Sequence, residues 1–261
     1  NKLAKNFYQK HGYIFTENKK FLNDELTELE MQHKLDNWFT LEKIDEDTYV
    51  ISEYKHREET HCYLLIGKEK ALLIDTGLGV ANIKEVVNGI TELPVMVVTT
   101  HVHWDHIGGH KYFDNITVHE NEKEWLMENF PLPLEIVKRN LLDENGEFPE
   151  CFDVEKYEVF HGTPQLIMCD NDEIDLGERV IKVVHTPGHS PGHCCFYEEQ
   201  RLYLYSGDLV YKGCLDMFYP STNPCEFAKS IKKVTGLSVG KILPGHHDLD
   251  VPVQMIFKID E

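Results

Sequence analysis

The sequence lacks several features that would place it in common functional classes. Its apolar runs are short: the stretch Pro94–Val98 is far too short to cross a bilayer. The first twelve residues contain no apolar segment of the kind found in secretory signal peptides. Neither a P-loop nor a GxGxxG motif occurs. We therefore expect no membrane span, no secretory signal and no glycine-rich nucleotide-binding loop.

Basic residues are also scarce. The chain has 26 Lys and Arg against 45 Asp and Glu, which gives a formal net charge of −19, and no basic run appears. An acidic surface of this size repels phosphate backbones and anionic membranes. We therefore expect no nucleic-acid partner.

Cysteine and histidine usage point in different directions. The seven cysteines are an odd number and include no CxxC pair, which predicts reduced thiols and a cytoplasmic location. The 15 histidines are many for an acidic chain of 261 residues. Histidine is a frequent ligand of transition metals, so this composition favours a metal-binding protein.

The chain divides into a short N-terminal segment and one large domain, as its length suggests. In residues 1–40, the apolar positions between Lys20 and Trp38 fit helical spacing loosely, which predicts an N-terminal helical extension. We expect it to pack on the main domain, with a homodimer contact or a lid as the alternatives. Residues 41–261 form the main domain, and residues 121–163 are expected to form a cap-like insertion of two short helices.

The main domain reads as short strands in two batches, with helices after each. The predicted strands are Thr48–Glu53, Cys62–Ile66, Ala71–Ile74, Pro94–Thr99, Gln165–Met168, Val180–Val184, Cys194–Tyr197, Arg201–Tyr205 and Lys241–Leu243. Helical spacing follows in Val80–Ile90, and Asn223 can cap a helix that ends at Gly236. This order predicts two β-sheets packed together and covered outside by helices.

The strongest chemical signal is THVHWDHIGG at residues 100–109. It places His101, His103, Asp105 and His106 in a tight turn directly after a strand predicted to be buried. Imidazoles and a carboxylate this close together suit divalent transition metals, and four such ligands can serve two adjacent ions.

Three further residues occupy similar places downstream. His189, Asp208 and His246 each follow a predicted strand and stand beside glycine, where the backbone can approach a site closely. One such residue alone would carry little weight. Three such residues after three strands, together with the HxHxDH turn, support the interpretation of that turn as a metal-binding motif.

These motifs resemble the metallo-β-lactamase superfamily of binuclear hydrolases: IDTG with Asp75, then HVHWDH, TPGHS, SGD and PGHH, over residues 45–250. The resemblance implies a four-layer αβ/βα sandwich with the metals at one edge of the sheets. It further implies one ion held by His101, His103 and His189, another by Asp105, His106 and His246, and Asp208 bridging both. Asp75 is expected to hydrogen-bond the HxHxDH turn or a ligand imidazole rather than to bind metal.

The implied cofactor is two Zn²⁺ ions per chain, with Fe or Mn as alternatives. Such a pair lowers the pKa of a bridging water to roughly 7 and stabilises the developing oxyanion. Asp105 is the candidate that orients the hydroxide or passes its proton to the leaving group.

Among the branches of this superfamily, LIDTGLG, SGDLVYKG and KILPGHH are similar to the acyl-CoA thioesterase branch. The resemblance suggests Tyr211 as an oxyanion donor and Phe218 and Tyr219 as lining of a substrate pocket. The expected reaction is hydrolysis of a small-molecule thioester or related ester. The alternatives are a lactonase of the same superfamily, a mononuclear-iron persulfide dioxygenase and a metal-stapled binding module.

Overall fold

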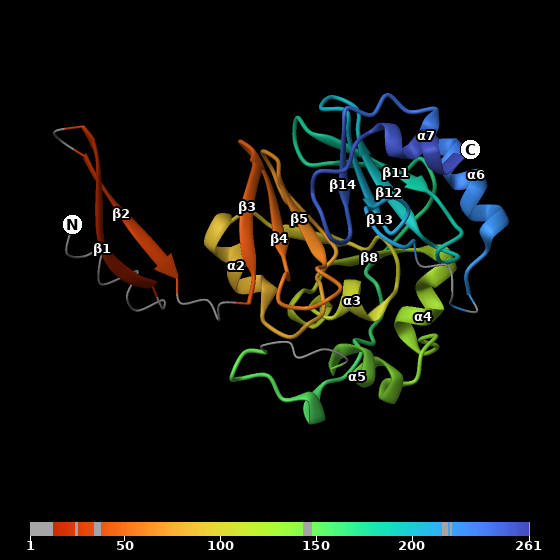
Figure 1. Cartoon of the computed structure of the whole chain (residues 1–261), viewed down its shortest axis with the longest axis horizontal. Coiled ribbons are helices and arrows are strands. Elements are labelled where there is room, and N and C mark those ends of the chain that lie inside the picture. Colours follow the sequence, from red (N-terminus) through yellow and green to blue (C-terminus); the bar gives the residue numbers. More distant parts are fainter. Residues whose placement is uncertain are drawn as a thin grey trace.

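The computed structural model describes residues 13–23, 26–33, 38–142, 148–215, 219 and 221–260. Two mixed β-sheets lie face to face, with helices outside them, as Figure 1 shows. The seven-stranded sheet has the order β3 (Thr40–Asp45), β4 (Thr48–Ser52), β5 (His61–Ile66), β6 (Ala71–Ile74), β7 (Val95–Val98), β8 (Ile116–His119) and β9 (Leu166–Met168). The five-stranded sheet has the order β10 (Glu173–Asp175), β11 (Val180–His185), β12 (Cys194–Glu198), β13 (Tyr203–Gly207) and β14 (Lys241–Pro244).

The helices connect these strands and cover the sheets. They are α2 (Ile83–Ile90), α3 (Trp104–Ile107), α4 (Lys123–Met127), α5 (Leu134–Leu142), α6 (Pro224–Thr235) and α7 (Gln254–Asp260), with short 3-10 turns at η1 (His110–Tyr112), η2 (Glu120–Glu122) and η3 (Val154–Lys156). Helices α4 and α5 lie in the segment predicted to hold two short helices. No helix in the described residues is both long and apolar enough to cross a membrane.

Strand periodicity explains why the fold has four layers. Along β5, Cys62 and Leu64 face the cluster under the outer helices, whereas Tyr63 and Leu65 face the other sheet. Successive side chains of a strand point to opposite faces, so a strand buried on both faces must be apolar throughout. On the other sheet, Phe196 packs between the sheets, and its neighbours along β12 pack beneath α6 and α7. The predicted αβ/βα sandwich is confirmed.

The N-terminal segment differs from the helix predicted there. Strands β1 (Tyr13–Asn23) and β2 (Leu26–His33) pair antiparallel with each other, apart from the two packed sheets in Figure 1. The apolar spacing fitted a helix only loosely, and Leu29 and Met31 also fit the two-residue period of a strand. The helical prediction is wrong for these strands. The expected packing of the segment on the main domain, like the alternatives of a homodimer contact or a lid, stays a prediction.

An ionic cluster ties the two sheets together at one edge. Arg179, just before β11, donates Nε and Nη2 to the two carboxylate oxygens of Glu198 at 3.0 and 2.8 Å. Its Nη1 donates to the carbonyls of Asp47, in the turn between β3 and β4, and of Ile66, the last residue of β5. Both side chains of the Arg179–Glu198 pair are almost fully buried. The charges of Arg179 and Glu198 thus neutralise each other at this edge. The candidate functional site lies at the opposite edge.

Candidate metal centre

Seven predicted ligands converge at the opposite edge of the sandwich. His101, His103, Asp105 and His106 follow β7, and His189, Asp208 and His246 follow β11, β13 and β14. All seven are buried, and none is more than 7% exposed. The seven side chains lie together because β7, β11, β13 and β14 all end at this edge. The structure brings together every residue that the sequence suggested as a ligand.

Three imidazoles form the first group of ligand atoms. The Nε2 of His101 lies 3.0 Å from the Nδ1 of His103, and the Nε2 of His189 lies 3.2 and 3.1 Å from these two atoms. Burial, and then the neighbouring imidazoles, lower the pKa of His101 and His103 well below the usual range. These rings are therefore neutral, and their inward nitrogens can point lone pairs at a common centre. Tetrahedral zinc separates ligand nitrogens by about 3.3 Å, close to these distances.

The second group combines two imidazoles with a carboxylate. The Nε2 atoms of His106 and His246 lie 3.1 Å apart, and Oδ2 of Asp105 lies 3.5 and 3.4 Å from them. Burial opposes a charge on His246, yet the carboxylates of Asp208 and Asp105 raise its pKa to about 9. The carboxylates thus create a negative potential that favours a cation here.

Asp208 lies between the two groups. Its Oδ2 is 3.4 Å from Nε2 of His189, and its Oδ1 is 3.2 Å from Nε2 of both His106 and His246. This buried Oδ1 makes no well-aligned hydrogen bond within the described part of the chain. A buried carboxylate oxygen this close to two imidazole nitrogens, with no well-aligned hydrogen bond to either, fits an oxygen directed at a shared ion. The donor set and this buried oxygen therefore fit divalent metal ions.

Asp75 fixes the orientation of ligand imidazoles. Its Oδ1 accepts from the backbone N–H of Thr100, and its Oδ2 accepts from Oγ1 of Thr100, both at 2.7 Å. The same Oδ2 accepts from Nδ1 of His106 at 2.8 Å. Thr100 Oγ1 in turn lies 3.0 Å from Nδ1 of His101. With the proton held on Nδ1, the Nε2 of each ring keeps its lone pair for a metal.

Two supporting residues were missed by the sequence analysis. Glu122 accepts from the backbone N–H groups of Val102 and Gly192, at 2.5 and 2.9 Å. It thereby joins the turn that carries His101 and His103 to the turn that carries His189. His193 accepts from the backbone N–H of Asp208 at 3.0 Å. The repeated PGH in TPGHSPGH was a signal for His193. Glu122 stands in an acidic stretch that gave no such signal.

A cavity of about 290 Å³ opens onto the ligands. It is lined by Arg57, Glu58, His103, Trp104, Asp105, His189, Asp208, Tyr211, Cys214, Tyr219, His246 and His247. The Tyr219 ring centre lies 5.2 Å from that of His103, and Tyr211 lies 5.6 Å from His246. The Tyr211 hydroxyl donates to the carbonyl of Cys214 at 2.8 Å. Phe218, the other predicted pocket residue, lies outside the described residues.

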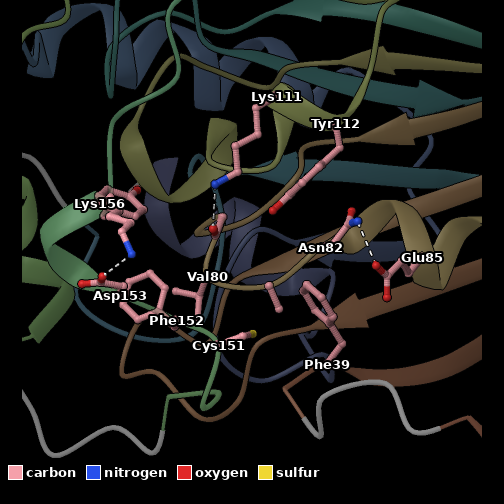
Figure 2. A pocket seen from close by; sticks show the side chains of 13 residues that line it. Phe39, Val80, Asn82, Glu85, Lys111, Tyr112, Cys151, Phe152, Asp153 and Lys156 are labelled. Carbon is pink, nitrogen blue, oxygen red and sulfur yellow. Dashed lines mark hydrogen bonds and ion pairs between the residues drawn. The ribbon is translucent and has the colours of Figure 1, made fainter. Parts of the chain in front are cut away.

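A larger cavity of about 330 Å³ lies elsewhere and contains none of the predicted ligands (Figure 2). Its charged groups pair locally: Lys156 with Asp153 at 2.9 Å, and Glu85 with the Asn82 amide at 3.0 Å. Lys111 donates to the carbonyl of Gly79. Size alone would favour this cavity, but the convergent metal-ligating groups place the candidate active site at the smaller one.

Comparison with known proteins agrees with this geometry. The family model described as "Metallo-beta-lactamase superfamily" matches residues 57–246 of this chain. The chain is similar to human acyl-coenzyme A thioesterase MBLAC2, with 30% identity over 229 residues, 80% of this chain and 81% of that protein. It is 25% identical to the probable metallo-hydrolase YqgX of Bacillus subtilis, over 59% of this chain and 68% of that protein.

Solved structures share the fold. The metallo-beta-lactamase from Pontibacter korlensis superposes with a TM-score of 0.66 at 18% identity, covering 85% of this chain and 97% of that one. The superfamily protein ST1585 from Sulfolobus tokodaii gives a TM-score of 0.61 at 19% identity, covering 83% and 85%. The chain belongs to the metallo-β-lactamase superfamily and is a metal-dependent hydrolase.

Proposed function

We propose that this chain hydrolyses thioesters of the acyl-CoA class at two divalent ions, zinc in the first place, bound by the seven buried ligands. The observation that carries the proposal is the Asp208 carboxylate, which turns one oxygen toward each group of histidines. The reaction class is supported by the 30% identical relative named an acyl-coenzyme A thioesterase, which aligns over 80% of this chain.

The seven ligands divide into the two sets described above, with Asp208 shared. When bound there, two such ions supply a water nucleophile at neutral pH and Lewis-acid polarisation of the substrate carbonyl. Iron or manganese would suit the same histidine and carboxylate donors. The protein's own contribution is to hold the ligands in place, through Asp75, Glu122 and His193.

Asp105 is the residue proposed to handle protons. Burial raises its pKa to about 6, although His106 and His246 oppose the rise. Its carboxylate lies beside His106 and His246 and can orient the attacking water and accept its proton. The water oxygen bonds to the thioester carbon, the carbon–sulfur bond breaks, and the sulfur leaves with the electron pair. Because a thiol ionises near pH 8.5, the leaving group needs little protonation.

Tyr211 and Tyr219 are proposed to contact the substrate. Both line the cavity beside ligand histidines. In this structure the Tyr211 hydroxyl donates to the Cys214 carbonyl. To stabilise an oxyanion it must exchange that acceptor for the substrate oxygen, and in the free protein it orders the wall of the cavity. Tyr219, packed over His103, would face the acyl group.

The test is the Asp208→Ala variant, studied by elemental mass spectrometry and thioester hydrolysis, with the exposed Asp250→Ala as control. We expect Asp208→Ala to lose at least one of about two ions per chain and nearly all turnover, and the control to keep both. Full activity with wild-type metal content would refute the shared-ligand assignment. In the wild type, about one iron per chain with oxygen uptake on a persulfide would replace the thioesterase proposal by the dioxygenase, and cleavage of lactones alone would replace it by the lactonase.

A further inference from the structure

The cavity over the metal ligands contains a cation that the proposed chemistry does not use. Arg57 is the only Lys or Arg among the described residues that line it. Its side chain is 32% exposed, and its Nε lies 3.4 Å from Oε1 of Glu58. The chain has a net charge of −19, so a positive side chain in the lining of this cavity is unusual for its surface.

The loop that carries Arg57 is tied to a metal ligand. Residues 53–60 connect β4 and β5 and close on themselves where the N–H of Glu53 donates to the carbonyl of Thr60 at 3.0 Å. The imidazole of His246 donates its Nδ1 proton to the carbonyl of Glu58 at 2.6 Å. The backbone beside Arg57 therefore has a fixed position relative to His246.

The other side of Arg57 is anchored as well. His56 is buried; its Nδ1 accepts from the N–H of Glu58 at 3.2 Å, and its Nε2 donates to the carbonyl of Leu141 in α5 at 3.1 Å. Its ring packs edge-on against Trp104, with the ring centres 5.9 Å apart. Arg57 thus stands between two anchored neighbours. A side chain on such a rigid loop loses less entropy when it binds a ligand.

We propose that Arg57 binds an anionic group of the substrate, a phosphate or a carboxylate, and so makes the site selective for charged thioesters. This inference rests on the proposed thioesterase function. A guanidinium stays protonated at every relevant pH and binds either anion through two parallel hydrogen bonds. The cation also offsets, at the cavity mouth, the repulsion that the acidic surface exerts on an anionic substrate.

The experiment compares one acyl group on two thiols. The wild type, Arg57→Met and Arg57→Lys are assayed with butanoyl-CoA, which carries phosphates, and with butanoyl-N-acetylcysteamine, which carries no charge. Succinyl-N-acetylcysteamine adds a carboxylate on the acyl side and separates the two sources of anion. The matched control is Lys212→Met, which removes a cation that pairs with Asp248 at 2.6 Å and lies outside the cavity lining.

We expect Arg57→Met to lower the ratio of kcat/KM for a charged over the neutral thioester by about tenfold or more, mainly through KM. Arg57→Lys should fall between the two, and Lys212→Met should keep the wild-type ratio. Added salt should lower the ratio in the wild type and have less effect in Arg57→Met. Metal content, measured on each variant, reports whether His246 has been disturbed.

An unchanged ratio in Arg57→Met would overturn the inference while leaving thioester hydrolysis intact. So would equal losses on all three substrates, or a fall in the ratio in Lys212→Met instead. A wild-type protein that hydrolyses none of the three thioesters would refute the proposed function itself, and the inference with it. The failure of either claim therefore has its own signature.

Discussion

Replacing Asp75 by Asn should disturb the metal centre without removing any ligand. Asp75 accepts three hydrogen bonds: from the backbone N–H of Thr100, from its hydroxyl and from Nδ1 of His106. An asparagine has the same shape, but one carboxylate oxygen becomes an NH₂ group that only donates. The substitution thus changes the hydrogen-bond pattern and leaves the packing alone.

Neither orientation of the new amide fits. If its NH₂ group faces His106, it meets the Nδ1 proton, and relief requires that proton to move to Nε2. That nitrogen lies 3.1 Å from His246 and 3.2 Å from Asp208 and is the one available to a metal. If the amide flips, its NH₂ group meets the backbone N–H of Thr100. Either way a buried donor faces a donor.

The expected size follows from these contacts. An unsatisfied buried donor costs about 1–3 kcal/mol, and loss of the partner that orients a ligand histidine typically lowers metal affinity by about 10–100-fold. We expect Asp75→Asn to weaken, by that factor, the binding of the ion that Asp105, His106 and His246 are proposed to hold. Turnover at limiting metal should fall in parallel.

The assay is competition with a chromophoric chelator, together with elemental mass spectrometry and thioester hydrolysis. Asp248→Asn is the matched control, because it removes the same charge from an exposed carboxylate near the cavity. Wild-type affinity for both ions in Asp75→Asn would show that Asp75 does not set the ring orientation. An equal loss in Asp248→Asn would show that net charge, rather than the hydrogen-bond pattern, is responsible.

Two predictions concern stability and can be measured by urea denaturation. Arg179→Met should lower the free energy of unfolding by up to about 3–5 kcal/mol, because the buried Glu198 then keeps only the partly exposed Arg201, whose Nε lies 3.4 Å from its Oε1. Adding Glu198→Leu should recover much of the loss, and a double variant no more stable than the single one would contradict this. Burial lowers the pKa of His61 to about 4, so between pH 6.5 and 4 the unfolded chain binds a proton that the folded chain excludes. The stability that His61 contributes is complete above pH 6.5 and decreases as the pH falls toward 4, by about 2 kcal/mol at pH 5. His61→Gln should therefore lose less stability than the wild type between pH 7.5 and pH 5, and an equal loss would refute the assignment.

The convergence of the candidate metal ligands could be predicted because they follow regular structure. His101, His189, Asp208 and His246 each come shortly after a strand whose apolar residues can be recognised in the sequence, and the last three stand beside glycine. Once those strands are assigned to packed sheets, their ends share an edge, and the ligands must meet there. The glycines matter at particular places: Gly79 has a φ of +74°, and a Cβ there would collide with the backbone of Gly108 at the end of α3.

The N-terminal hairpin could not be predicted in the same way. Residues 13–33 contain apolar side chains at irregular spacing, and both a helix and a pair of strands leave some of them out of phase. Long regular segments are dictated by their period, whereas a weakly periodic segment is decided by pairing with its neighbour in the chain. Strands β1 and β2 pair with each other, and that pairing is not visible in the pattern of either strand alone.

The contact between the loop at residues 53–60 and the candidate metal centre could not be predicted for a different reason, and that reason bears on function. The contact between the Glu58 carbonyl and His246 joins residues 188 positions apart in the sequence. Because the acceptor is a backbone atom, the identity of the side chain at position 58 does not indicate the contact. Arg57 precedes the residue that provides this carbonyl. A displacement of the Arg57 backbone therefore alters the hydrogen bond that keeps the proton on Nδ1 of His246. Substrate recognition and metal-ligand geometry share one segment, so substitutions in this loop that act through the backbone should change metal affinity and substrate preference together, whereas those confined to the Arg57 guanidinium should change preference alone.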